Sequence, residues 1–256
     1  YPLWHYEVED LLGLKNNKGT EDNRVRHMDY GVQFNKLMYE RLMTGGNITL
    51  FSPHDVPGLY DAFFADQDEF KRLYEQAERN TSIRKKTISA TELFSSFMQE
   101  RKDTGRIYLQ NVDHANSHSS FKTEVAPIKQ SNLCCEIDLP TKPLNDVKDP
   151  DGEIALCTLS AINWGIFKNP QDMEKACTLA VRGLDALLSY QNYPIIAAQM
   201  ATENRRPLGI GIINLAFFLA KNDVSYSDPN ALNLVDTWAQ HWSYYLIKAS
   251  ADLAVE

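Results

Sequence analysis

Apolar residues recur at three- and four-residue intervals in several stretches of the chain, and this spacing predicts amphipathic helices. A first helix is predicted over residues 30–43, where Gly45 and Gly46 end the pattern. Ser52 is a start signal for a second helical stretch. The apolar positions of that stretch are Phe70, Leu73, Tyr74 and Ala77.

The segment that begins at Ser89 gives the clearest helix prediction. Ser89 and Glu92 have the spacing of a capping box, in which each side chain bonds the backbone N–H of the other residue. Apolar residues then share one face, and Gly105 is expected to end the helix. The residues of that face are Leu93, Phe94, Phe97 and Met98.

Two long helices are predicted in the second half of the chain. Asn169 and Pro170 start the first of them, and Pro229 precedes the second. The predicted buried side of the first is Met173, Ala176, Cys177, Ala180, Leu184, Leu187 and Leu188. The apolar stripe of the second contains Trp238, Trp242, Tyr245, Leu246, Ala249 and Leu253, and this helical spacing favours core burial over a radical relay.

Short apolar runs between these helices predict strands. They cover residues 106–112, 130–139 and 153–159, and residues 205–212 are predicted to form a short strand that enters a helix. Helices that bracket a few short strands favour an α/β fold over an all-α or all-β fold. The pattern alone leaves a barrel and an open sheet as alternatives.

Composition narrows the class of protein. With 256 residues, 43% of them apolar, the chain can bury a sizeable core, and a net charge of −8 argues against a surface that coats a nucleic-acid polymer. The sequence has no run of 18 apolar residues and no signal-peptide pattern at its start, so we predict no membrane association and a cytoplasmic location. Four cysteines without an export signal are expected to be free thiols.

The two ends of the sequence suggest a piece of a longer or split polypeptide. The chain opens at Tyr1 without a methionine, and it closes at Glu256 inside an apolar periodic run without a glycine stop or a polar tail.

The segment around Cys134 carries the strongest candidate chemistry. In an extended backbone, side chains alternate between two faces, so Asn132, Cys134 and Glu136 would point the same way. A carboxylate can take a hydroxyl proton, an amide can hold a second hydroxyl, and sulfur can exchange a hydrogen atom or attack as a nucleophile. These three side chains could therefore act on a polyol.

A structural interpretation of each cysteine stands beside the chemical one. Buried cysteines commonly behave as small apolar residues. Cys177 lies on the apolar face of a predicted helix and is expected to be core. Adjacent cysteines have poor geometry for a disulfide, so we expect a structural role for Cys135.

Two other motifs are weaker candidates. His114 and His118 could meet only on a helix, and residues 115–120 read as a loop, so we predict no metal site there. Gly209 and Gly211 lack the third glycine and the downstream acid of a dinucleotide site, and we expect them to permit close packing.

Residues 131–137 (SNLCCEI) are similar to the Asn-Leu-Cys-x-Glu segment on the finger loop of class I ribonucleotide reductase large subunits. Other blocks resemble that family in the same order, at residues 24–31, 51–59, 104–114, 140–144, 152–160 and 206–211. A short cysteine motif arises easily by chance, whereas ordered blocks across nearly the whole chain do not. The resemblance implies that residues 1–256 are the central portion of a ten-stranded α/β barrel into which the finger loop threads.

The resemblance also implies a role for each residue of the candidate site. Cys134 would become a thiyl radical and abstract the ribose 3′-hydrogen, and Glu136 would take the 3′-hydroxyl proton. Asn132 would hydrogen-bond the sugar of a ribonucleoside diphosphate. Cys157 would be one of two cysteines that reduce the ribose and end as a disulfide, and its partner would lie outside this chain. A dithiol supplies the two electrons and two protons that such a reduction needs.

The remaining parts of such an enzyme would lie elsewhere. By resemblance they are an ATP-binding regulatory region, loops for deoxynucleotide effectors, a phosphate-binding turn, relay tyrosines, and terminal cysteines that receive electrons from thioredoxin or glutaredoxin. A separate metal-containing small subunit would supply the radical, and large subunits would form a homodimer. We expect this segment to bind no cofactor itself and to be inactive alone.

Two alternatives remain at this point. The adjacent Cys134 and Cys135 also suggest a glycyl-radical enzyme, but these residues hold no C-terminal glycyl-radical motif and the flanking blocks differ. The chain could instead be a noncatalytic fragment that only completes a barrel.

Overall fold

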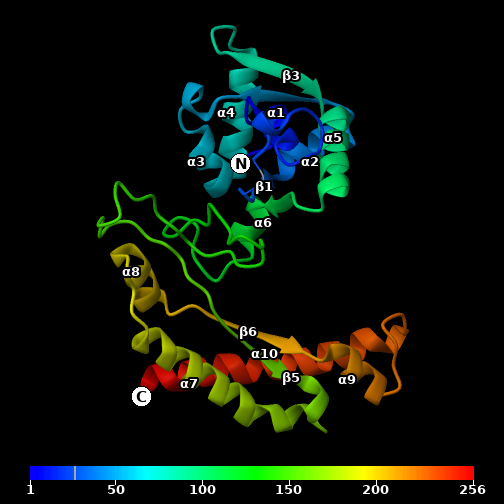
Figure 1. Ribbon diagram of the computed structural model, residues 1–256, viewed down its shortest axis with the longest axis vertical. Coiled ribbons are helices and arrows are strands. Elements are labelled where there is room, and N and C mark those ends of the chain that lie inside the picture. The colour runs from blue at the N-terminus through cyan, green and yellow to red at the C-terminus, as the bar shows by residue number, and fades with distance from the viewer. Residues whose placement is uncertain (26) are drawn as a thin grey trace. The chain divides into compact units, whose positions relative to one another are not determined.

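The computed structural model describes residues 1–25 and 27–256, and the chain divides into two compact units, Tyr1–Thr141 and Lys142–Glu256 (Figure 1). Arg26, which belongs to the family-like block at residues 24–31, lies outside the described residues.

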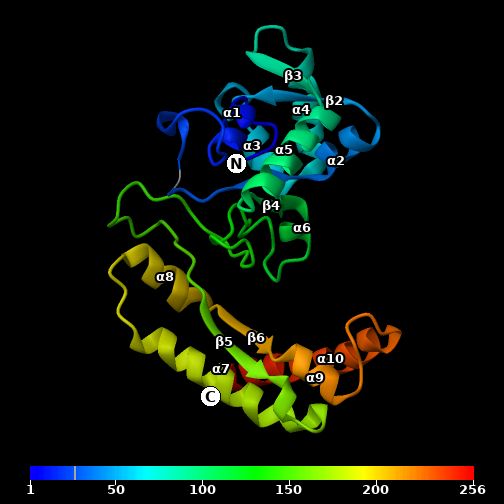
Figure 2. The same cartoon turned by 45° about the vertical axis from the view of Figure 1, so that its right-hand side comes forward.

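The first unit combines short strands and helices, as Figure 2 shows from a second angle. Its strands are β1 (Gly31–Phe34), β2 (Asn47–Phe51), β3 (Lys85–Ser89) and β4 (Tyr108–Asn111). Its α-helices are α1 (Val8–Gly13), α2 (Lys36–Met43), α3 (Leu59–Ala65), α4 (Gln67–Arg79), α5 (Ala90–Thr104) and α6 (Val112–Ser117). Its described residues also form the 3₁₀ turns η1 (Glu21–Asn23) and η2 (Pro53–Asp55).

Two strand pairs organise this unit. β1 and β4 are parallel, and Gln33 on β1 is in register with Gln110 on β4. β2 and β3 are antiparallel. An aromatic core fills the space between the strands and helices, with Trp4 and Phe34 fully buried. The first residues of the chain also attach to β1, because the Gln33 N–H donates to the Tyr1 carbonyl and the Leu3 N–H donates to the Gln33 carbonyl.

The second unit is built on a parallel pair, β5 (Thr158–Asn163) and β6 (Leu208–Ile213). Its α-helices are α7 (Glu174–Tyr190), α8 (Ile196–Arg205), α9 (Leu215–Lys221) and α10 (Pro229–Val255), and its 3₁₀ turns are η3 (Trp164–Ile166) and η4 (Pro170–Met173). Trp164, Phe218 and Trp238 form the centre of its core. An added Cβ would lie 2.4 Å from Cδ2 of the exposed Leu159 side chain at Gly209, but 3.9 Å from the Ser160 carbonyl oxygen at Gly211. The predicted close packing therefore does not hold at Gly211, and at Gly209 it involves only the end of a leucine side chain.

Most predicted helices are confirmed. α4 carries the periodic residues after Phe70, α5 ends at Gly105 in the left-handed conformation, and α10 begins at Pro229. The helix predicted at Pro170 begins as the 3₁₀ turn η4 and continues as α7, with Cys177 on its buried side. Leu187, which we predicted to be buried, is 49% exposed.

Several boundaries differ from the prediction. The helix predicted over residues 30–43 is divided into β1 and α2, because Asn35 accepts a hydrogen bond from the Met38 backbone and caps a helix that starts at Lys36. Ser89 makes no capping hydrogen bond, because it is the last residue of β3 and its backbone is fixed by pairing with Asn47.

The strand predictions are confirmed only in part. Residues 106–112 contain β4, residues 205–212 contain most of β6, and the run at 153–159 overlaps β5 by two residues. The predicted α/β class is confirmed. The strands form three two-stranded sheets within the described residues, so the ten-stranded barrel stays a prediction. None of the described helices combines the length and apolar content that a membrane span requires.

Candidate active site

Cys134 lies on a tight turn, which we call the Cys134 turn and define as residues 131–138. Ser131 and Asp138 close it as an isolated antiparallel bridge. The Asn132 backbone N–H donates to the Ile137 carbonyl over 3.1 Å, and the Cys135 N–H donates to the Asn132 carbonyl over 3.1 Å. The turn therefore has a short two-sided stem and a tip at residues 133–135.

The Asn132 side chain holds the turn from inside. Its Oδ1 accepts the backbone N–H groups of Glu136 and Ile137, each over 3.1 Å. Its Nδ2 donates to Oε1 of Glu136 over 2.6 Å. A hydrogen bond to an ionised carboxylate is about twice as strong as one between neutral groups. Asn132 therefore shapes the backbone and orients the carboxylate together.

The extended segment predicted over residues 130–139 is wrong, and so is the alternation that placed three side chains on one face. Asn side chains compete with strand ladders by bonding nearby backbone N–H groups, and Asn132 does so twice. The structure still brings Asn132 and Glu136 together, through the turn and not through a strand face. Cys134 lies between them in sequence and is exposed.

Cys135 attaches the tip of the turn to β4. Its thiol donates to the Leu109 carbonyl with an S···O distance of 3.7 Å. Its φ angle is 61°, a left-handed conformation that costs a residue with a Cβ about 1–2 kcal/mol. The half-buried Cys135 thus faces the sheet while its neighbour Cys134 faces outward, which supports the structural role expected of Cys135.

The sequence interpretation missed a set of polar residues beneath the turn. Gln110 Nε2 donates to Oδ1 of Asp138 over 2.7 Å, and Gln33 Nε2 donates to Oε1 of Gln110 over 2.8 Å. Burial raises the pKa of the Asp138 carboxyl, and the hydrogen bond from Gln110 opposes that rise. The sequence feature that could have revealed these residues is a glutamine within each of the short apolar strands β1 and β4.

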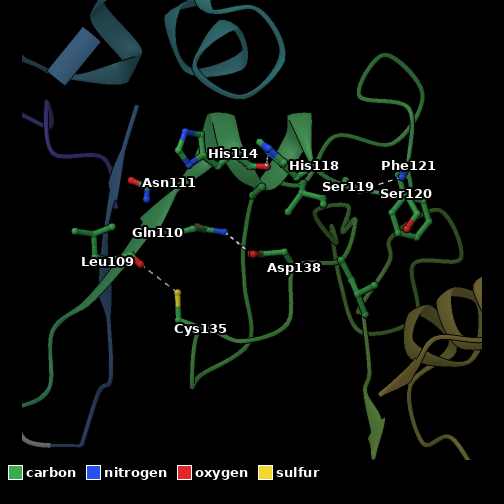
Figure 3. A pocket seen from close by; sticks show the side chains of 13 residues that line it. Leu109, Gln110, Asn111, His114, His118, Ser119, Ser120, Phe121, Cys135 and Asp138 are labelled. Carbon is green, nitrogen blue, oxygen red and sulfur yellow. Dashed lines mark hydrogen bonds between the residues drawn. The ribbon is translucent and has the colours of Figure 1, made fainter. Parts of the chain in front are cut away.

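Two cavities border the turn. One, of about 620 Å³, is lined by Cys135 and Asp138 from the turn and by residues of β4 and α6 (Figure 3). The other, of about 240 Å³, is lined by Asn132, Leu133 and Cys135 together with β1 and β4. Cys135 lines both cavities, whereas Cys134 lines neither.

His114 and His118 also face the larger cavity. The loop predicted over residues 115–120 is wrong at its start, because α6 extends to Ser117. The helix brings the two imidazole rings to a centroid distance of 5.7 Å. Among residues 1–25 and 27–256, however, no three His, Cys, Asp or Glu side chains converge as metal ligands do.

Cys157 belongs to the second unit and is the exposed residue directly before β5. The chain that leads to it is fixed at Glu153, whose backbone pairs with Lys142 and whose carboxylate bonds Arg205 at the end of α8. The Ile154 N–H also donates to the Ala197 carbonyl over 3.3 Å. Burial alone would raise the pKa of the Glu153 carboxyl. Hydrogen bonds and positive charge from Arg205 and Lys142 outweigh this effect, so the pKa is lowered.

Cys177 is a core residue, as predicted. Its exposed fraction is 0%, and burial raises the pKa of its thiol to about 11. A thiol with so little thiolate character is a poor nucleophile. Cys134 and Cys157 are therefore the exposed thiols among the four cysteines.

The family model described as "Ribonucleotide reductase, barrel domain" matches residues 1–256, the whole chain. The chain belongs to the ribonucleotide reductase family. It is 65% identical to ribonucleoside-diphosphate reductase 1 subunit alpha of Salmonella typhimurium and 63% identical to that of Escherichia coli. It is also 54% identical to the subunit alpha of Enterobacteria phage T4. All of this chain and 34% of each relative are covered, so the chain spans about a third of their length.

Membership of this family confirms the resemblance drawn from the ordered sequence blocks. It also argues against the glycyl-radical family that the adjacent cysteines suggested.

Proposed function

We propose that residues 1–256 form the central portion of the catalytic barrel of a ribonucleoside-diphosphate reductase large subunit. The observation that carries the proposal is the hydrogen-bonded pair of Asn132 and Glu136 on a turn that exposes Cys134. The family match over the whole chain supports the same assignment. In the proposed subunit the Cys134 turn is the tip of the finger loop within a ten-stranded barrel.

The proposed reaction begins at the sulfur of Cys134. As a thiyl radical, it takes the 3′-hydrogen atom of the ribose, so an S–H bond forms, the C3′–H bond breaks and the unpaired electron moves to C3′. Glu136 accepts the 3′-hydroxyl proton, which eases departure of the 2′-hydroxyl as water. Cys157 and a second cysteine then become a disulfide. One of their two protons leaves with the 2′-hydroxyl as water, and the other ends on C2′ together with the two electrons. Glu136 returns its proton to the 3′-oxygen, and Cys134 returns its hydrogen atom to C3′ and is a thiyl radical again.

The contacts of Glu136 suit it to this proton transfer. Asn132 occupies Oε1 of the carboxylate, and we assign Oε2 to the substrate hydroxyl. A carboxylate that is already held by an amide needs little reorientation when the substrate arrives, and correct orientation accounts for a large part of enzymatic rate acceleration. Asn132 would therefore orient the general base and contact the sugar.

Other components follow from this assignment. The proposed partners are a small subunit that contains a metal and generates the radical, the rest of the large subunit with the second redox cysteine, and thioredoxin or glutaredoxin as reductant. Large subunits would form a homodimer in the cytoplasm, and ATP and deoxynucleotide effectors would bind outside this segment.

A Glu136→Gln variant of the full-length subunit, assayed with its small subunit, tests the general-base role. Glutamine keeps the size and one acceptor oxygen but cannot take a proton, so kcat should fall by roughly 100-fold or more while KM for the ribonucleoside diphosphate changes little. The matched control is Glu124→Gln, which alters an exposed glutamate of the same unit.

Unchanged kcat in Glu136→Gln would overturn the general-base role. Absence of deoxynucleotide formation by the unaltered chain, in every combination with its flanking segments and the small subunit, would instead support the noncatalytic fragment.

A further inference from the structure

Two buried glutamines connect the parallel strands β1 and β4 to the Cys134 turn. Gln33 is 3% exposed and Gln110 is 8% exposed, and they are partners in the strand register. Gln33 Nε2 donates to Oε1 of Gln110, and Gln110 Nε2 donates to Oδ1 of Asp138 (Figure 3 shows the second bond). Buried polar groups are costly unless they are hydrogen-bonded. The amide nitrogens of both glutamines are bonded, whereas Oε1 of Gln33 has no partner among the described residues.

The amide chain reaches both sides of the turn. Asp138 is the last residue of the turn and pairs with Ser131 at its base. On the other side, Gln33 Nε2 also donates to the carbonyl of Lys129, two residues before Ser131, over 2.8 Å. One pair of strand side chains therefore fixes the chain where it enters the turn and where it leaves.

The entering side has further attachments of its own. The Lys129 ammonium donates to Oδ1 of Asp61 on α3 over 2.7 Å. Asn116 on α6 accepts the backbone N–H of Ile128 and donates to its carbonyl, over 2.8 and 2.9 Å. The entering chain is thus already held by two helices. Beyond the tip, which the Cys135 thiol attaches to the Leu109 carbonyl of β4, the base of the turn on its leaving side is attached to β4 by the bond from Gln110 to Asp138.

The direction of each amide follows from its neighbours. Gln33 faces two acceptors, the Lys129 carbonyl and Oε1 of Gln110, so it must present its nitrogen to both. Gln110 then has its oxygen occupied and can only donate to the turn, where the carboxylate of Asp138 accepts. The two strands therefore offer a donor of fixed direction at the base of the Cys134 turn.

We propose that Gln110, supported by Gln33, is a positioning residue for Cys134 and acts on it through Asp138. This inference rests on the proposed function, in which the Cys134 sulfur must approach one C–H bond of the ribose. A displacement of about 1 Å between reacting groups can cost roughly 100-fold in rate. The strand amides hold the base of the turn, Asn132 holds its interior, and the sulfur at the tip depends on both.

The test uses a Gln110→Met variant of the full-length large subunit, assayed with its small subunit. Methionine has a similar volume but donates no hydrogen bond. We expect kcat to fall by roughly 10- to 100-fold with KM for the ribonucleoside diphosphate nearly unchanged. Amide hydrogen exchange in residues 131–137 should accelerate by roughly 10-fold, since the turn opens locally. Gln99→Met, which removes an exposed glutamine from α5, is the matched control.

Asp138 supplies a rescue pair that does not disturb the buried strands. Asp138→Ala removes the acceptor and should reproduce the loss of kcat and the faster exchange. Asp138→Asn keeps an oxygen that can accept from Gln110, so it should restore both measurements to near the unaltered values. If Asp138→Asn were as impaired as Asp138→Ala, the hydrogen bond from Gln110 would not be the positioning contact.

The two proposals can fail separately. If Gln110→Met is folded, and neither turn exchange nor kcat changes, Gln110 does not position the turn, whatever Cys134 does. If exchange accelerates and a Cys134→Ser variant keeps its turnover, the turn is held as described but the assigned role of Cys134 is wrong. Faster exchange with unchanged kcat, while Cys134→Ser is inactive, would also overturn the positioning role.

Discussion

The Asn132 amide nitrogen lies 2.6 Å from Oε1 of Glu136, while the oxygen of the same amide accepts the backbone N–H groups of Glu136 and Ile137. One side chain thus folds the turn through its oxygen and orients a carboxylate through its nitrogen. A substitution of Asn132 that keeps the side-chain oxygen and removes the nitrogen can separate the folding of the turn from the orientation of Glu136.

Asn132→Asp and Asn132→Ala should therefore have different effects. Aspartate keeps an acceptor for the two backbone N–H groups, so the turn should persist, but it cannot donate to Glu136 and turnover should fall. Alanine loses both roles, and the turn should lose about 1 kcal/mol of local stability for each hydrogen bond removed. Hydrogen exchange of residues 131–137 and steady-state turnover measure the two effects in the full-length subunit. Equal exchange in the two variants would contradict this division.

The sequence predicted the long helices well because each carries several apolar residues at helical spacing. α5 and α10 are bounded by a glycine and a proline where expected. β1 was missed because its four residues are too few to show the alternation of apolar and polar residues that marks a strand. Its apolar residues also run directly into those of the helix that Asn35 caps. Local pattern cannot reveal such a boundary, since it depends on pairing with β4, which is distant in sequence.

The residues of the candidate site stay a prediction, and the geometry predicted for them is wrong. Asn132, Cys134 and Glu136 were named from their spacing, yet the extended backbone assumed for them is a turn. The turn depends on three hydrogen bonds of one asparagine, and a periodicity of two cannot show these. Gln33 and Gln110 were missed because their partners lie 28 to 96 residues away.

Cys177 should resist alkylation in the folded subunit. Burial raises the pKa of its thiol from an ordinary value of 9.0 to about 11, so its thiolate fraction at pH 8 falls roughly 100-fold. Treatment with iodoacetamide at pH 8, followed by peptide mass spectrometry, should label Cys177 only after denaturation. Labelling at the rate of the denatured subunit would show that the α7 core is open.

The raised pKa of the Cys177 thiol predicts that the folded subunit becomes less stable toward unfolding at alkaline pH. Because the folded-state pKa is raised, its contribution is complete below pH 9.0, the ordinary value, and is lost as the pH rises through about 11.

Glu153 should contribute to stability above acidic pH. The Glu153 carboxyl is partly buried, yet Arg205 and Lys142 hold its pKa below the ordinary value of 4.5. Its contribution is therefore present above pH 4.5 and is lost as the pH falls through the lower folded-state value. Glu153→Gln removes this dependence, so the melting temperature of the unaltered subunit should fall more between pH 7 and pH 4 than that of the variant. If the melting temperatures of both proteins fell equally, the ion pairs of Glu153 would contribute nothing to stability.

We propose that the sulfur of Cys134, and not that of its neighbour Cys135, carries the radical. The most direct measurement compares deoxynucleotide formation by Cys134→Ser and Cys135→Ser variants of the full-length subunit with its small subunit, beside their affinity for the ribonucleoside diphosphate. Serine at position 135 can still donate to the Leu109 carbonyl and hold the turn, whereas serine at position 134 cannot form a thiyl radical. We predict normal substrate binding by both variants, turnover by Cys135→Ser and none by Cys134→Ser. Substantial turnover by Cys134→Ser would contradict the assignment.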